Sequence, residues 1–138
     1  MSVEENKATV RAVEEAWDSQ DLDALDQYFA DDFDNSLSGM PGLPGGLAGA
    51  KMAHQGVMQA FPDRKVAIED IFGEGDEVFV RTRVTGTNQG GFLGTPANGN
   101  PFDIAAVGTY GFRDGKIVSH WGLNDGMTLM MQLQGGSA

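Results

Sequence analysis

The chain has 138 residues, the length of one domain, which is enough to bury roughly two-thirds of the unfolded surface in a core with room for a pocket. Twenty acidic and nine basic side chains give a net charge of −11, which disfavours nucleic acid and membrane surfaces as partners, because both are anionic. The absence of cysteine excludes disulfides, thiolate nucleophiles and cysteine-based zinc sites. No long apolar run or basic leader is present, so we expect a cytoplasmic protein.

Apolar residues recur at helical spacing in the first part of the chain. Val10, Val13 and Trp17 predict an amphipathic helix over residues 3–18, with charged residues such as Glu14 between them on the solvated face. A second, shorter helix is predicted through Tyr28, with its buried stripe formed by Leu22, Leu25 and Phe29. The two helices should pack together as a hairpin.

The next segment changes character several times. A short strand is predicted over residues 32–37, and the proline and glycine residues of 39–46 predict an exposed loop that is a candidate lid. A third helix is predicted over residues 47–61, where Pro62 ends it.

After Pro62 the apolar pattern changes from helical period to alternation. Strands are predicted over residues 66–72, 78–87, 102–112 and 117–123, with a glycine-rich loop over 90–100. A final helical turn or two follows from Met127. Helices followed by consecutive antiparallel strands indicate one α+β domain over residues 1–138, in which the helices cover one face of a curved sheet.

The run from Asp114 to Asp125 combines a turn, a strand and a group of polar residues. Asp114-Gly115 favours a type I′ hairpin turn, because both central positions of that turn need positive φ. Beyond the turn, His120, Asn124 and Asp125 can converge at the end of one strand. The pattern therefore predicts a site without identifying its substrate.

Several segments in this order resemble the SnoaL-like polyketide cyclase family of the nuclear transport factor 2-like superfamily. They are Phe61-Pro62-Asp63, Gly75-Asp76, Gly86-Thr87-Asn88-Gln89-Gly90, Phe92-Leu93-Gly94, Asp114-Gly115-Lys116-Ile117, His120-Trp121 and Gln132-Leu133. The resemblance implies a cone-shaped α+β fold, in which a curved antiparallel or mixed sheet and N-terminal helices enclose an apolar pocket. It also implies a homodimer and no metal or organic cofactor.

The chain departs from the family pattern at four positions. Family members commonly carry histidines where this chain has Asn35 and Asn88, and the acid and histidine of the family's aldol cyclases align with Gly122 and Gly108. The resemblance therefore carries over the fold but not the aldol reaction.

Alternation along the last two strands predicts a pocket wall made by His120 and Asn124 together with Tyr110 and Phe112. His120 is the first candidate for proton transfer, because an imidazole titrates near neutral pH. A structural hydrogen bond within the sheet is the alternative. Asp125 is a candidate second acid or base, and N-cap of the terminal helix is its alternative role.

The other candidates are substrate-binding residues. Asn88 and Asn35 can orient a carbonyl or structure a loop, and Arg81 can hold a carboxylate or enolate or pair with an acid such as Asp103. Tyr110 can hold negative charge that develops on oxygen.

Three residues of the helical part complete the predicted site. His54 and Met58 are neighbours on the third predicted helix and can close one side of the pocket, although His54 can also face solvent. Trp17 either lines the pocket or fills the core. The two histidines are far apart in the sequence and lack a carboxylate-rich helical motif, so no metal site is predicted.

These features predict a pocket protein for an apolar, oxygenated ring or polyketide-like ligand. Cofactor-independent ring closure, isomerisation or water addition to an epoxide are the candidate reactions. The alternatives are a binding domain without catalysis and a dimeric accessory domain of the same fold.

Overall fold

The computed structural model describes residues 2–35 and 44–135, as nine elements in these ranges. The helical elements are α1 (Val3–Ser19), the 3-10 helix η1 (Leu22–Gln27), α2 (Gly46–Ala60) and α3 (Gly126–Leu133). The strands are β1 (Phe29–Asn35), β2 (Lys65–Glu74), β3 (Glu77–Thr87), β4 (Pro101–Arg113) and β5 (Lys116–Asn124).

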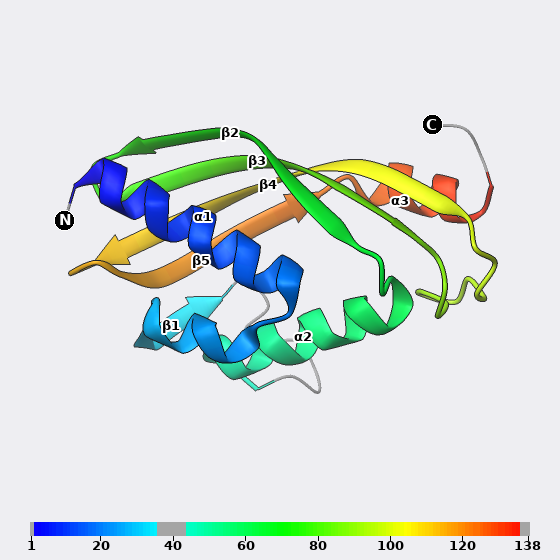
Figure 1. Cartoon of the computed structure of the whole chain (residues 1–138), viewed down its shortest axis with the longest axis horizontal. Coiled ribbons are helices and arrows are strands. Elements are labelled where there is room, and N and C mark those ends of the chain that lie inside the picture. Colours follow the sequence, from blue (N-terminus) through cyan, green and yellow to red (C-terminus); the bar gives the residue numbers. More distant parts are fainter. Residues whose placement is uncertain (1, 36–43, 136–138) are drawn as a thin grey trace.

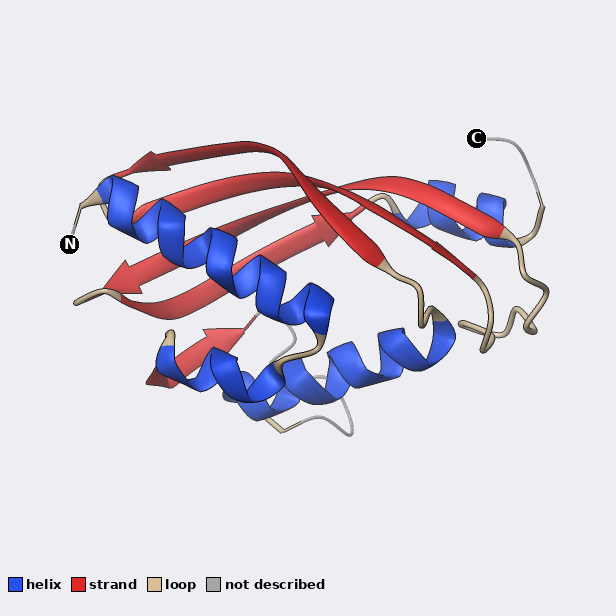
Figure 2. Cartoon of the chain, viewed as in Figure 1, coloured by secondary structure: helices blue, strands red, loops and turns tan. Residues whose placement is uncertain are grey.

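The five strands form one mixed sheet in the order β1-β5-β4-β3-β2. β1 runs parallel to β5, and the other neighbouring strands are antiparallel. The long strands bend over α1 and α2, while α3 lies beside the far end of the sheet (Figure 1). Figure 2 shows the helices α1 and α2 together on one side of the curved sheet. The predicted α+β fold with a curved sheet is confirmed.

Local signals explain where the first helix begins. Ser2 and Glu5 form a capping box, in which the Ser2 hydroxyl accepts from the Glu5 main-chain N–H at 3.1 Å and the Glu5 carboxylate accepts from the Ser2 N–H at 3.2 Å. These bonds satisfy donors that have no partner inside the helix. The predicted helix over residues 3–18 is confirmed.

The second predicted helix is shorter than expected. Phe29 is not on its buried stripe but begins β1, where it pairs with Ile117 of β5. The Ile117 N–H also donates to the Tyr28 carbonyl at 2.9 Å. Pairing with a strand that follows much later in the sequence therefore overrides the helical period at Phe29.

The predicted lid over residues 39–46 falls largely on 39–43, which lie outside the described residues, as do residues 36 and 37 of the predicted strand. At its other end, Gly46 already begins α2.

The hairpin between β4 and β5 sets the register of the site. Asp114 and Gly115 have φ values of 52° and 78°, which confirms the predicted turn with two positive φ angles. In the resulting register Tyr110 lies opposite His120 and Gly108 lies opposite Gly122. All four residues therefore lie on the same face of the sheet.

Two clusters of buried side chains hold the layers together. The first joins α1 and η1 to the sheet and includes Val10, Leu25 and Ile117, all completely buried. The second joins the end of α2 and α3 to the sheet and includes Phe61 and Leu133. In the part of the chain that the structure describes, no helix has the length and hydropathy that a membrane crossing needs.

Candidate functional site

A cavity of about 340 Å³ lies between the two long helices and the inner face of the sheet. Its wall is formed by side chains of α1, β1, α2, β3, β4 and β5, together with Arg64 directly before β2. The volume lies in the range of small-molecule pockets. Of the predicted site residues, the structure brings together Trp17, His54, Tyr110, His120 and Asn124 in this wall.

His120 stands on β5 with its ring against that of Tyr110, the residue opposite it on β4. The ring centroids are 4.6 Å apart and the planes are tilted by 44°. Burial lowers the pKa of His120 to about 4, because an imidazolium loses hydration in the cavity wall. The imidazole is therefore neutral at neutral pH and can accept a proton.

Two glycines make room for this imidazole. A Cβ atom at Gly108 would lie 3.2 Å from Nε2 of His120, and a Cβ at Gly122 would lie 3.1 Å from Cε1. Both distances are shorter than ordinary van der Waals contact, so a side chain at either position would push against the ring. The ring of His120 therefore lies directly against the backbone of Gly108 and Gly122.

Glu14 is a cavity residue that the sequence analysis assigned wrongly to the solvated face of α1. Its carboxylate is buried and accepts a hydrogen bond from the Tyr110 hydroxyl at 2.8 Å. Burial raises the pKa of Glu14, and burial together with this carboxylate raises the pKa of Tyr110. The helical spacing contained the signal, because Glu14 lies four residues after Val10 and three before Trp17.

Arg64 is a second cavity residue that the sequence did not indicate. Burial lowers the pKa of its guanidinium, and the nearby charges of Glu14 and Asp18 oppose this effect. Its Nη1 atom is buried and has no hydrogen-bond partner among residues 2–35 and 44–135. Arg64 lies in the connection between α2 and β2, where no periodic pattern predicts the direction of a side chain.

His54 and Trp17 form the helical side of the wall. Their ring centroids are 4.8 Å apart. Burial and the charge of Arg64 lower the pKa of His54, while a hydrogen bond to the Trp17 main chain and the charge of Asp18 oppose that shift. In the described part of the chain, the Nε2 atom of His54 is buried and has no hydrogen-bond partner. The alternative that His54 faces solvent is therefore wrong.

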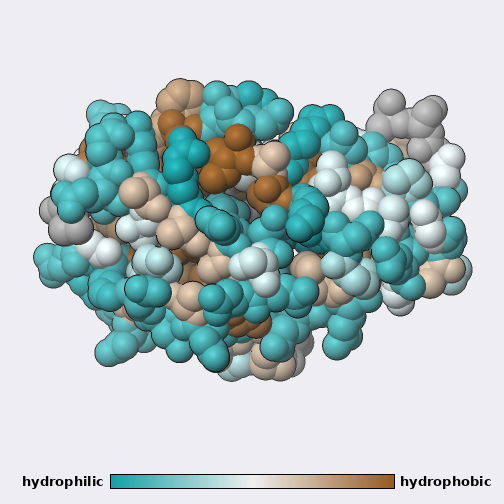
Figure 3. All heavy atoms as spheres, viewed as in Figure 1, coloured by the Kyte–Doolittle hydropathy of each residue, from teal (hydrophilic) through white to brown (hydrophobic). Residues whose placement is uncertain are grey.

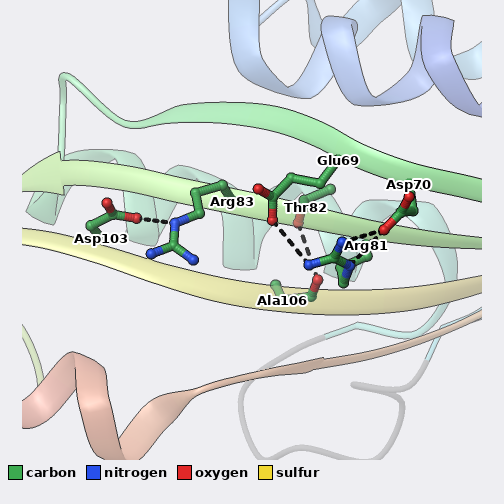
Figure 4. Close-up of polar contacts among 7 residues, drawn as sticks. All are labelled: Glu69, Asp70, Arg81, Thr82, Arg83, Asp103 and Ala106. Carbon is green, nitrogen blue, oxygen red and sulfur yellow. Dashed lines mark hydrogen bonds and ion pairs between the residues drawn. The ribbon is translucent and has the colours of Figure 1, made fainter. Parts of the chain in front are cut away.

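Arg81 is not in the cavity, contrary to the prediction that it binds ligand. Figure 4 shows it on the sheet between Glu69 and Asp70, with its Nε donating to Asp70 at 2.8 Å. Arg83 on the same face donates to Asp103 at 2.5 Å, so Asp103 pairs with Arg83 and not with Arg81. Alternation along β3 turns both arginines outward, because Val80 and Thr82 face the cavity.

Three further predicted residues have structural contacts instead of lining the cavity. Asn88 is completely buried and holds the loop after β3, donating to the Pro96 carbonyl at 3.0 Å and accepting from the Gly91 N–H at 2.9 Å. Asp125 caps α3 by accepting from the Thr128 N–H at 3.2 Å. Met58 is buried but does not line the cavity.

Two of the residues predicted for the site, Phe112 and Asn35, remain to be placed. Phe112 faces inward as predicted, because the burial alternation of β4 continues through it, but it is buried in the first core cluster and does not line the cavity. The side chain of Asn35 lies outside the described part of the structure, although its main chain pairs with His120.

One face of the outer surface shows how polar and apolar atoms are distributed on the molecule. The face of the molecule in Figure 3 is mostly hydrophilic, and apolar atoms gather between α1 and β2.

The fold resembles several solved structures over nearly the whole chain. IdmH from Streptomyces antibioticus, described as a proposed polyketide cyclase, is 31% identical with a TM-score of 0.82, and the match covers 94% of this chain and 98% of that one. AclR from Streptomyces galilaeus, described as a proposed hydroxylase, is 28% identical with a TM-score of 0.85, covering 99% and 89%. TsrD from Streptomyces laurentii has the same fold, with 22% identity, a TM-score of 0.85 and coverage of 96% and 97%.

No curated protein matches the chain. The family model described as SnoaL-like polyketide cyclase matches residues 7–133, which is nearly the whole chain. The α+β architecture with its curved sheet agrees with this match. The chain therefore belongs to the SnoaL-like polyketide cyclase family.

Proposed function

We propose that this protein binds an apolar, oxygenated ring or polyketide-like molecule in the cavity and rearranges it by proton transfer. Ring closure, isomerisation and water addition to an epoxide are the reactions that such a site serves without a cofactor. Aromatic and aliphatic side chains form much of the wall and suit an apolar ring, while a small number of polar groups can orient its oxygens.

The position of His120 carries this proposal. Its neutral imidazole lies in the cavity wall over two glycines, and no hydrogen bond to another described residue occupies its nitrogens. A neutral imidazole with a free lone pair in a cavity is a proton acceptor.

The paired groups of Glu14 and Tyr110 supply a second proton-handling position. Burial raises the pKa of both, so the pair retains its hydroxyl proton through neutral pH. In the proposed reaction His120 takes a proton from carbon next to a carbonyl. The raised pKa of Glu14 favours its protonated form, in which the Glu14–Tyr110 pair has a second hydrogen to donate to the oxygen that becomes negative.

Binding without turnover is the second candidate function, and the pKa of His120 is the observation that favours it. A general base is most efficient when its pKa lies near the operating pH, and a value of about 4 is well below neutral. A ligand held but not converted would raise the thermal stability of the protein and be recovered unchanged.

Mass spectrometry of copurifying small molecules, followed by turnover assays on the compound identified, tests the proposal. His120→Ala should lower turnover about 10²- to 10⁴-fold, the usual contribution of a positioned acid or base. Arg113→Gln is the control, because Arg113 is exposed and pairs with Asp32 away from the cavity. Unchanged turnover in His120→Ala would remove His120 from the mechanism, and wild-type binding without conversion would establish the second candidate.

We also propose that two copies associate through the outer face of the sheet. Phe72, Phe79, Thr109 and Trp121 follow one another across β2, β3, β4 and β5 on this face. Phe72 and Trp121 are 59% and 49% exposed, and nearby Leu123 is 61% exposed. A second copy would bury this apolar row, which is larger than the isolated apolar residues usual on a monomer.

A further inference from the structure

Glu14 has one carboxyl oxygen in the cavity wall that is not held by the protein. Its Oε1 atom accepts from the Tyr110 hydroxyl at 2.8 Å, and no other described residue forms a hydrogen bond or an ion pair with this carboxyl group. In the described part of the chain, three side-chain atoms are fully buried without a partner, and Oε2 of Glu14 is not one of them. Oε2 therefore keeps contact with open space, and because Glu14 lines the cavity, that space is the cavity.

Tyr110 spans the distance between Glu14 and His120. Its hydroxyl bonds to Glu14, and its ring centroid lies 4.6 Å from that of His120. All three residues line the cavity. A ligand ring of similar size that lies beside Tyr110 can therefore reach Oε2 of Glu14 with an oxygen attached directly to the ring, and the imidazole of His120 with its other end.

The chemistry of a carboxyl group narrows the class of ligand group that suits this position. The single hydroxyl hydrogen of Tyr110 is used in the bond to Oε1, so Oε2 is the position that the pair leaves for a ligand. An ionised Oε2 can only accept a hydrogen bond, whereas a protonated Oε2 can donate one. A carbonyl oxygen fits only the protonated form and an amide N–H only the ionised form, but a hydroxyl group fits both.

We propose that Oε2 of Glu14 binds a hydroxyl group on the ligand's ring, as in a phenol or an enol, an inference that rests on the proposed ligand-binding function of the cavity. The Tyr110 hydroxyl holds the other carboxyl oxygen and so fixes the direction of Oε2. In the proposed proton transfer, an enol hydroxyl is the form that the ligand's carbonyl oxygen takes once it is protonated. Glu14 therefore selects the oxygen substituent of the ring, whereas His120 acts on a carbon atom.

Naphthol and methylnaphthalene, substituted at the same ring position, are matched probes for this subsite, because a hydroxyl and a methyl group are similar in size. Naphthol is neutral at neutral pH, like the phenol of tyrosine, so charge attraction does not contribute to its binding. The hydroxyl preference is the Kd of methylnaphthalene divided by the Kd of naphthol, both measured by isothermal titration calorimetry. Glu14→Leu should lower this preference about tenfold relative to the wild-type protein, the scale of one hydrogen bond.

Two further variants test whether the carboxyl group itself is responsible. Glu14→Gln keeps a carbonyl oxygen and an NH₂ group, so it should retain most of the preference that Glu14→Leu loses. Arg113→Gln alters an exposed arginine away from the cavity and should leave the preference unchanged. Carbon NMR of labelled glutamate gives a direct readout: the carboxyl resonance that is missing in Glu14→Gln should shift when naphthol is added to the wild-type protein, and much less with methylnaphthalene.

The outcomes separate this subsite from the proposed function. The same hydroxyl preference in the wild-type protein and in Glu14→Leu, with circular dichroism showing that the variant is folded, would overturn the subsite while leaving ligand binding intact. A preference that survives in Glu14→Leu and disappears in Tyr110→Phe would assign the hydroxyl to Tyr110 instead. Failure of the wild-type protein to bind either probe would count against the ligand-binding function as well as the subsite.

Discussion

His120 combines a chemical role with an energetic penalty. Its ring lies in the cavity wall against Tyr110, and burial lowers its pKa to about 4 from an ordinary value of 6.5. Because the folded state disfavours the charged form of the imidazole, the free energy of unfolding must depend on pH. His120 therefore links the proposed proton transfer to folding.

We predict that this linkage destabilises the protein in mild acid. Between pH 6.5 and pH 4 the unfolded chain binds a proton at His120 and the folded chain does not, so stability falls as the pH is lowered through this window and is unaffected above it. The free energy of unfolding is lower by about 3 kcal/mol near pH 4. Urea unfolding at several pH values should show a steeper acid loss in the wild-type protein than in His120→Asn.

The comparison with His120→Asn isolates one group from the many carboxylates that also titrate in acid. The free energies of unfolding of the two proteins should converge as the pH falls and stay a constant distance apart above about pH 7. Parallel curves across the whole range would mean that the folded protein does not disfavour the imidazolium.

At the residue scale, some side-chain directions were available in the sequence and others were not. Glu14 falls on the apolar stripe of α1 by spacing, and Arg81 falls on the outer face of β3 by alternation with Val80. Their polar character led to the wrong interpretation in both cases. The direction of Arg64 depends on how the α2–β2 connection packs against α1, which no local pattern contains.

At the scale of elements, α3 closes the second core cluster and depends on its N-terminal cap. Leu129 and Leu133 of this short helix are buried in the cluster, and Asp125 supplies two acceptors to Thr128. The hydrogen bonds from Thr128 lower the pKa of Asp125, so its carboxylate is ionised and suited to a helix N-terminus.

We predict that Asp125→Ala lowers thermal stability by a few degrees without reducing turnover, because it removes a cap and no cavity residue. Differential scanning calorimetry and the turnover assay measure the two effects. Asp125→Asn retains a capping acceptor and should remain close to the wild-type protein in both measurements. A large loss of turnover at unchanged stability would restore the catalytic role that the sequence suggested.

The hairpin of β4 and β5 shows why some elements were predictable. Asp114-Gly115 determines the turn, and the turn sets the register that places Tyr110 opposite His120. β1 was less predictable, because its parallel pairing with β5 joins segments that are distant in the sequence. Local turn chemistry specifies a hairpin, whereas parallel pairing depends on the packing of the whole chain.

At the scale of the whole molecule, the apolar row on the outer face of the sheet predicts self-association. Leu123→Glu should convert a dimer into a monomer with an unchanged circular dichroism spectrum, because it would bury a charge in the contact between copies. Size-exclusion chromatography with light scattering measures the mass. Met52→Glu is the control, since Met52 is 48% exposed on α2 and not on the sheet.

The outcome of that experiment distinguishes two uses of the outer face. A wild-type monomer at micromolar concentration would contradict the proposed dimer, as would a dimer that Leu123→Glu leaves intact. Dissociation by Met52→Glu alone would place the contact on the helical side of the molecule. The net charge of −11 adds repulsion between copies, so association should strengthen as salt is added.

The sequence by itself determined the order of helices and strands, the hairpin and the family, because these depend on periodicity, turn residues and short motifs within one segment. Only the tertiary structure showed that Glu14 and Arg64 share a cavity with His54, Tyr110 and His120. It also showed that Gly108 and Gly122 make space for an imidazole. The physical reason is that burial, pKa and the presence or absence of hydrogen-bond partners arise from contacts between distant segments, and no single segment encodes them.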